Sequence, residues 1–87
     1  MALIPIPPVE AHVGWDRRRA APAWLRWAGH AFEVVELRAV RDERRAFPRE
    51  QGPRITYLLQ AADGSLASAV YDGRRRRWYV EAIEPTT

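Results

Sequence analysis

The chain has no cysteine, no lysine and no asparagine among its 87 residues. The lack of cysteine excludes disulfide bonds, thiolate metal sites and a catalytic thiol, and it fits the cytoplasmic location that we expect. No apolar run approaches the length of a membrane-spanning helix, so we expect no association with a membrane. The apolar stretch Met1–Pro8 lacks a basic region and contains three prolines, which is unlike a signal peptide.

Residue patterns that support catalysis or metal binding are also scarce. His12 and His30 are the only histidines, and neither has an acidic partner at a diagnostic spacing. Glu33 and Glu36 differ in strand parity, so they do not form the carboxylate pair that glycosidases use. The sequence has neither a serine nucleophile motif nor a glycine-rich phosphate loop. We therefore predict a protein that is not an enzyme and has no catalytic residue, cofactor or metal site.

The main signal along the chain is an alternation of apolar and polar residues, which predicts β-strands. Six strands are expected at residues 9–15, 24–28, 30–41, 54–62, 65–72 and 77–84. A flat sheet of this size would expose one face and two edges. We therefore predict an all-β domain over residues 9–85, a small six-stranded antiparallel meander that forms a partly open SH3-like barrel or a strongly bent sheet. Residues 1–8 are expected to form a proline-rich apolar arm.

The alternation also assigns residues to the core. The expected core residues are Val9, Ala11, Val13, Trp15, Leu25, Trp27, Ile55, Tyr57, Leu59, Ala61, Leu66, Val70, Trp78, Val80 and Ala82. In the third strand a bulge near Val34–Val35 would place Phe32 and Val34 on the core side together with Val35, Leu37 and Ala39. A helix from Phe32 to Arg45 is the alternative, and the adjacent β-branched valines favour the strand. Asp63-Gly64 predicts a two-residue hairpin turn, and residues 42–47 predict one helical turn.

All fourteen basic residues are arginine. Three segments, Asp16–Arg19, Arg41–Arg54 and Asp72–Arg77, carry formal charges of +2, +2 and +3, whereas the rest of the chain sums to −4. In an antiparallel meander, the connections after the first, third and fifth strands lie at the same end. These connections are the three basic segments, so the sequence predicts a barrel with one basic end. A GC-rich genome also favours arginine over lysine, so the positions of the arginines are more informative than their identity.

The arginine tracts and two aromatic residues are the candidate binding residues. Like charges in a tight hairpin repel one another, and a bound polyanion would relieve this repulsion and release counterions. Exposed aromatics beside arginine are typical of single-stranded nucleic-acid platforms, because bases stack on them. The candidate nucleic-acid-binding residues are Arg17, Arg18, Arg19, Arg74, Arg75, Arg76, Arg77, Trp24, Arg26 and Tyr79. The alternatives are that the arginines are solvated or pair with Glu81 and Glu84, and that Trp24 packs beneath residues 1–8. Trp15 is expected to cap the barrel.

Three stretches of the chain follow a known pattern. They are Trp27-Ala-Gly-His-Ala-Phe32-Glu-Val34-Val-Glu36, the turn Asp63-Gly64, and Arg77-Trp78-Tyr79-Val80-Glu81. From Val9 to Glu84 the chain resembles a family of small uncharacterised bacterial domains with the pattern W-x-G-x-x-[YF]-x-V, a turn, and G-R-W-Y-[LV]-E. Some of these domains are linked to proteins similar to Y-family translesion polymerases, so the resemblance implies a bacterial protein associated with DNA repair. The family has no established functional residues. This chain departs from the pattern because Arg76 replaces the glycine and the third loop lacks tryptophans.

Two hypotheses of function follow. The first is a non-enzymatic module that binds nucleic acid through its basic end, with Arg17–Arg19 and Arg74–Arg77 on phosphates and with Trp24 and Tyr79 stacking on bases. The second is a protein-interaction module or a homodimer, which would use the apolar N-terminal arm or an exposed edge strand to bind its partner.

Overall fold

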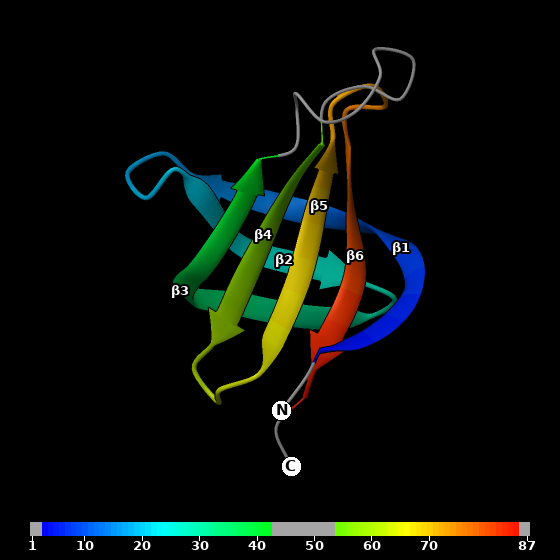
Figure 1. Ribbon diagram of the computed structural model, residues 1–87. Coiled ribbons are helices and arrows are strands. Elements are labelled where there is room, and N and C mark those ends of the chain that lie inside the picture. The colour runs from blue at the N-terminus through cyan, green and yellow to red at the C-terminus, as the bar shows by residue number, and fades with distance from the viewer. Residues whose placement is uncertain (1–2, 43–53, 86–87) are drawn as a thin grey trace.

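The structure is a computed structural model in which residues 3–42 and 54–85 are described. These residues form six strands: β1 (Ile4–Asp16), β2 (Ala21–Trp27), β3 (His30–Asp42), β4 (Arg54–Ala61), β5 (Leu66–Asp72) and β6 (Arg77–Glu84). Each strand pairs antiparallel with the next, and β6 pairs with β1, so the sheet forms a closed barrel (Figure 1). The predicted six-stranded antiparallel all-β fold is confirmed, with a barrel that is closed rather than partly open. The predicted helical turn and most of the second basic segment fall on residues 43–53, outside the described residues.

β1 and β3 are long strands of 13 residues each, and both change partners along their length. The first part of β1 pairs with β6, whereas the part after Ala11 pairs with β2. β3 pairs with β2 up to Glu33 and with β4 from Val34 onward. As a result, the β1–β2 hairpin crosses behind β4, β5 and β6 instead of running alongside them (Figure 1). Residues 4–8, which the sequence assigned to an arm, lie within β1.

Side chains inside the barrel form one apolar core. Its buried residues are Ala11, Leu25, Phe32, Val34, Tyr57, Leu59, Ala67, Ala69 and Val80. Trp27 and Trp78 pack against this core, as the alternation predicted. The alanines leave room for the large aromatic rings, because small barrels are filled by alternating small and large side chains.

A bulge in β3 changes which residues face the core. The β3–β4 register shifts just after Val34, so the bulge predicted there is confirmed. Val35 is 49% exposed instead of lying in the core, whereas Leu37 packs against the core as expected. A second shift leaves Ala39 exposed, so its predicted core position is wrong. Because β3 is a continuous strand, the alternative helix over the same residues is also wrong.

β5 presents a different face to the core than the sequence predicted. Ala67 and Ala69 are completely buried in the core, and Leu66 is only partly buried, so its predicted core position is wrong. Val70 is buried as predicted. It lies on the opposite face of β5 from Ala69, however, where it pairs with Tyr79.

A bulge in β6 explains a second difference. Val80 pairs with Ala69 and Ala82 pairs with Ser68, which leaves Glu81 as an extra residue in β6. The extra residue reverses the alternation beyond it. Ile83 therefore packs against the core, and the prediction that Ala82 does so is wrong.

The β4–β5 connection is a longer loop than the predicted two-residue turn. The N–H of Ala61 donates to the carbonyl of Ser65 (2.9 Å), and the N–H of Gly64 donates to the carbonyl of Ala61 (3.0 Å). Gly64 has a φ of 90°, a backbone conformation that glycine adopts without steric cost. Ala62 therefore belongs to the loop together with Asp63 and Gly64, so the loop starts one residue earlier than the Asp63-Gly64 signal suggested.

Candidate nucleic-acid interface

The turn between β1 and β2 is organised by Asp16. Its Oδ1 accepts hydrogen bonds from the backbone N–H groups of Arg18 (2.9 Å) and Arg19 (3.3 Å), as an Asx turn does. Ala20 then adopts a left-handed conformation with a φ of 52°. These contacts hold the backbone in one shape, while the side chains of Arg17, Arg18 and Arg19 remain exposed.

The turn between β5 and β6 repeats this local structure. Oδ1 of Asp72 accepts hydrogen bonds from the backbone N–H groups of Arg74 (3.0 Å) and Arg75 (3.2 Å). Arg76 adopts the left-handed conformation, with a φ of 56°. Both basic turns therefore begin with an aspartate that fixes the backbone, and both have exposed arginines at the second and third positions after it.

Acidic side chains neutralise only some of these arginines. Arg77, the first residue of β6, pairs with Glu10 of β1 at 2.6 Å. Arg19 and Arg75 make longer pairs, 3.7 and 4.0 Å, with the aspartates that begin their turns. Within the described residues, the arginines of the two turns that have no ion pair are Arg17, Arg18, Arg74 and Arg76. Since exposed ion pairs contribute little free energy, an incoming anion can also compete for the paired arginines.

Tyr79 lies on the outer face of β6 and is coupled to the β5–β6 turn. A hydrogen bond with the Tyr79 side chain and the nearby charge of Asp72 raise the pKa of the Arg75 guanidinium, and the Tyr79 contact is the larger cause. These residues border a shallow hollow of about 220 Å³, lined by Pro8, Arg54, Val70, Asp72, Arg75, Tyr79 and Glu81. The structure therefore brings Tyr79 together with the arginine turn, as the first hypothesis requires.

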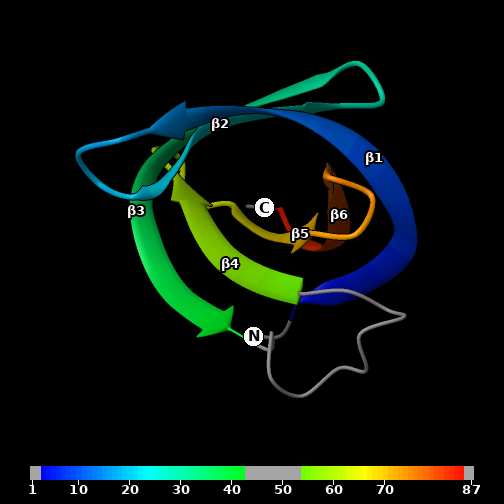
Figure 2. The same ribbon diagram turned by 90° about the horizontal axis from the view of Figure 1, so that it is seen from above.

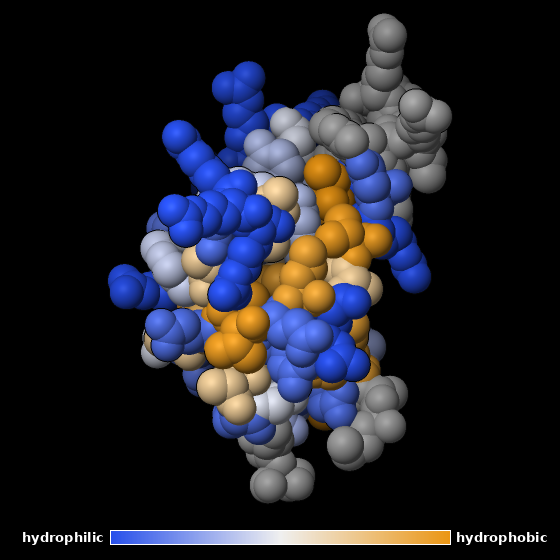
Figure 3. All heavy atoms as spheres, turned by 90° about the vertical axis from the view of Figure 1, so that its left-hand side faces the viewer, coloured by the Kyte–Doolittle hydropathy of each residue, from blue (hydrophilic) through white to orange (hydrophobic). Residues whose placement is uncertain are grey.

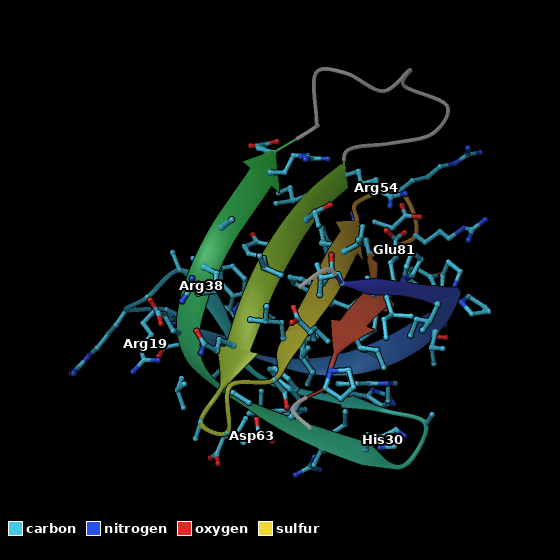
Figure 4. All side chains as sticks on the ribbon, turned by 60° about the horizontal axis from the view of Figure 1, so that its bottom comes forward. Arg19, His30, Arg38, Arg54, Asp63 and Glu81 are labelled. Carbon is cyan, nitrogen blue, oxygen red and sulfur yellow. The ribbon has the colours of Figure 1, made fainter. Side chains whose placement is uncertain are left out.

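Arg54 and Glu81 form the main ion pair on this side of the barrel. Nη2 of Arg54 lies 2.5 Å from both carboxylate oxygens of Glu81, and the two side chains point toward each other from β4 and β6 (Figure 4). Glu81 was an expected partner for the arginines after β5. Instead, it pairs with an arginine of β4 that was not among the candidate site residues.

Four aromatic rings pack together at the end of the barrel that carries the basic turns. The Trp15 ring centroid lies 5.9 Å from that of Tyr57 and 6.2 Å from that of Trp78. Trp78 also contacts Tyr57 (5.4 Å) and Tyr71 (5.1 Å). Tyr57 is buried, whereas Trp15 is 47% exposed. Trp15 thus has one part of its ring packed against the cluster and the other part open to solvent.

This aromatic cluster connects the two basic turns. Trp15 directly precedes the turn at Asp16, while Tyr71 and Trp78 flank the turn between β5 and β6. Seen along the barrel, the two turns lie on opposite sides of it (Figure 2). The β5–β6 turn lies at the top of the barrel in Figure 1, and the β1–β2 turn projects sideways from its upper left. The two basic segments therefore lie toward the same end of the barrel but point in different directions. The sequence assigned Trp15 to capping and overlooked it as a binding residue, although its position beside Asp16–Arg19 was the available signal.

Trp24 and Arg26 lie elsewhere, on the outer face of β2. The guanidinium carbon of Arg26 lies 4.9 Å from the centre of the Trp24 ring, a cation–π contact. A Cβ atom built on Gly14 would lie only 2.0 Å from Nε1 of Trp24, so the ring covers Gly14 on the neighbouring strand. Trp24 therefore packs on Gly14 of β1 and not beneath the first residues of that strand, of which Ile4 and Pro5 pair with β6. The structure does not bring Trp24 next to Tyr79, because β1 separates β2 from β6.

Within residues 3–42 and 54–85, no group of histidine, aspartate and glutamate side chains is placed to hold a metal ion. The same residues contain no helix that is long and apolar enough to cross a membrane. No protein-family model, curated protein or solved structure matches the chain.

Proposed function

We propose that this protein is a non-enzymatic module that binds single-stranded nucleic acid at the basic end of its barrel. The observation that carries the proposal is the position of Trp15, an exposed tryptophan supported by an aromatic cluster between two arginine turns. A base stacked on Trp15 would place its neighbouring phosphates near these turns. The proposed location is the bacterial cytoplasm, and the sequence resemblance adds an association with DNA repair.

The chemistry of the two turns suits phosphate recognition. Guanidinium groups match phosphate oxygens through their planar set of donors, and the turn backbones are already fixed by Asp16 and Asp72. Stacking on an aromatic ring tolerates any base, so binding would show little sequence preference. Arg75 and Tyr79 extend the basic surface along β6. Trp24 and Arg26, which were candidates from the sequence, lie outside the proposed contact.

Removing unpaired arginines from both turns tests the proposal. A double variant, Arg18→Ala with Arg74→Ala, should bind a labelled oligothymidine about tenfold more weakly than the wild type. The slope of log affinity against log salt should fall by about 1.4, since each neutralised charge contributes about 0.7 for a single strand. Fluorescence anisotropy at several salt concentrations measures both quantities.

The matched control removes two exposed arginines that lie outside the two basic turns, Arg26 and Arg38. This variant, Arg26→Ala with Arg38→Ala, has the same net charge as the test variant, so it separates local contacts from the overall charge. It should retain the wild-type salt slope. Equal losses in the two variants would mean that only the total charge matters, and the proposed site would be wrong.

A further inference from the structure

A proline interrupts the pairing of β2 with β3. The last pair between these strands is Trp24 with Glu33, and continuing that register would place Pro22 opposite Val35. Proline has no N–H to donate and is confined to the ends and edges of sheets. The carbonyl of Val35 instead accepts a hydrogen bond from the Arg19 side chain, at 3.5 Å. From this point the β1–β2 hairpin and the second half of β3 diverge.

The divergence leaves one edge of β3 without a strand partner. From Val35 to Val40, β3 pairs with β4 on one side, and among the described residues no strand pairs with it on the other side. An unpaired strand edge presents a row of backbone donors and acceptors that another chain can bind. The barrel is therefore closed by its overall strand order, yet it has a short open edge beside the β1–β2 turn.

Two exposed valines lie on this edge, and the surface around them is basic. Val35 and Val40 are each 49% exposed. The view of this side shows apolar surface surrounded by strongly hydrophilic side chains (Figure 3), and Arg19 and Arg38 both lie beside β3 (Figure 4). Glu36 is the acidic residue on the edge, and it pairs with Arg38 at 3.7 Å. The unpaired Arg17 and Arg18 leave this surface with a net positive charge.

We propose that an extended, acidic peptide segment of a partner protein adds to β3 along Val35–Val40 as a further strand. Backbone hydrogen bonds would provide affinity, and alternate side chains would provide specificity, as in other cases of β-strand addition. Apolar side chains of the peptide would cover Val35 and Val40, and its carboxylates would face the arginines of the β1–β2 turn. This site goes beyond the proposed nucleic-acid contact, whose base stacks on Trp15, although both sites use arginines of the β1–β2 turn.

Charge complementarity favours an acidic peptide over a second copy of the chain. A second copy would bring its own positively charged edge, with Arg19 and Arg38, against the same positively charged edge, and like charges across an interface disfavour association. The carboxylates of an acidic strand would instead attract these arginines.

The test uses the full chain, labelled with ¹⁵N, and a capped hexapeptide of alternating glutamate and valine. Binding should shift the backbone amide signals of Val35–Val40 and slow their hydrogen exchange. A peptide with lysine in place of glutamate should bind at least tenfold more weakly. A glutamate–valine peptide with N-methyl groups on alternate amides should lose binding to the same extent, because it keeps its charges but lacks the backbone donors.

Two variants of the protein locate the site. Val35→Glu places a negative charge on the edge and should weaken peptide binding at least tenfold. Ile4→Glu is the matched control, because Ile4 is an equally apolar and exposed strand residue (56%) that pairs with β6, and it should bind like the wild type. The amide spectrum of each variant checks that it is folded. Trp15→Ala should keep full peptide affinity, which separates this proposal from the nucleic-acid proposal.

Several results would overturn the proposal. One is a set of shifts outside Val35–Val40, and another is equal binding of the N-methylated peptide. Unchanged affinity in the Val35→Glu variant, or no shift at millimolar peptide, would have the same consequence. If the amide chemical shifts of Val35–Val40 change with protein concentration alone, the edge binds a second copy. If an oligonucleotide changes these chemical shifts and the peptide does not, the edge belongs to a nucleic-acid surface.

Discussion

Trp15 and Trp24 lie on opposite faces of the β1–β2 hairpin, and their neighbours give them different roles. Trp15 is supported from below by Tyr57 and Trp78 and adjoins a basic turn. Trp24 covers Gly14 and is itself covered by Arg26. Alternation in the sequence separated the two faces correctly. The same alternation pattern favoured Trp24 as the stacking residue. Strand parity shows which rings face outward, but it does not show which of them already contact neighbouring residues.

At the residue scale, the stability of the fold should depend on Gly14, because the Trp24 ring lies directly against it. In a Gly14→Ala variant the new methyl group would overlap the indole ring and displace it, which should lower the free energy of unfolding by about 1 kcal/mol. Urea denaturation measures this change. In a Trp24→Ala background the same substitution should have almost no effect, because the ring is gone. A Gly14→Ala protein as stable as the wild type would contradict the contact.

At the scale of the elements, the existence of six strands could be predicted because each shows a period-two alternation. The face of β6 beyond Val80 could not, because the bulge at Glu81 reverses the alternation there. The face of β5 could not, because its core residues are the small Ala67 and Ala69, whereas the larger Leu66 and Val70 lie in the other phase. A bulge leaves no sequence signal when both neighbouring phases contain apolar residues, as in Ala82 and Ile83. The sequence did contain a signal for the open edge of β3. Pro22 follows the first basic turn, and a proline cannot continue the hydrogen-bond ladder between strands.

The two aspartate-capped turns give a prediction about elements. Asp72→Ala removes the acceptor for two backbone N–H groups and should lower the free energy of unfolding by about 1–2 kcal/mol. Asp72→Asn keeps an oxygen at the same position, so its stability should stay within about 0.5 kcal/mol of the wild type. Thermal or chemical denaturation distinguishes them. If both variants lost the same stability, the charge of Asp72 would matter more than its hydrogen bonds.

At the scale of the whole molecule, the meander connectivity places both described basic turns toward the upper end of the barrel in Figure 1, on opposite sides of it. This arrangement follows from strand order, which is why the sequence could predict it. The aromatic cluster between the turns could not be predicted, because it depends on how strongly β1 bends to bring Trp15 against Tyr57 and Trp78.

Nucleic-acid binding should not depend on pH between about 6 and 8. Arginine side chains stay protonated throughout this range. The raised pKa of Arg75 favours its charged form further, so its charge is lost only well above this range. The histidines lie away from the two basic turns, His12 on the outer face of β1 and His30 at the start of β3. Anisotropy titrations at constant ionic strength test this, and a marked fall in affinity as the pH rises toward 8 would indicate a histidine in the contact.

The most direct measurement of the central claim is the affinity of a labelled oligothymidine for the wild type, Trp15→Ala and Trp24→Ala at near-physiological salt. Circular dichroism first establishes that both variants are folded. Stacking of one base contributes about 1–3 kcal/mol, so Trp15→Ala should bind at least about fivefold more weakly, while Trp24→Ala should bind like the wild type. Wild-type affinity in the Trp15→Ala variant, or a loss confined to Trp24→Ala, would contradict the proposed interface.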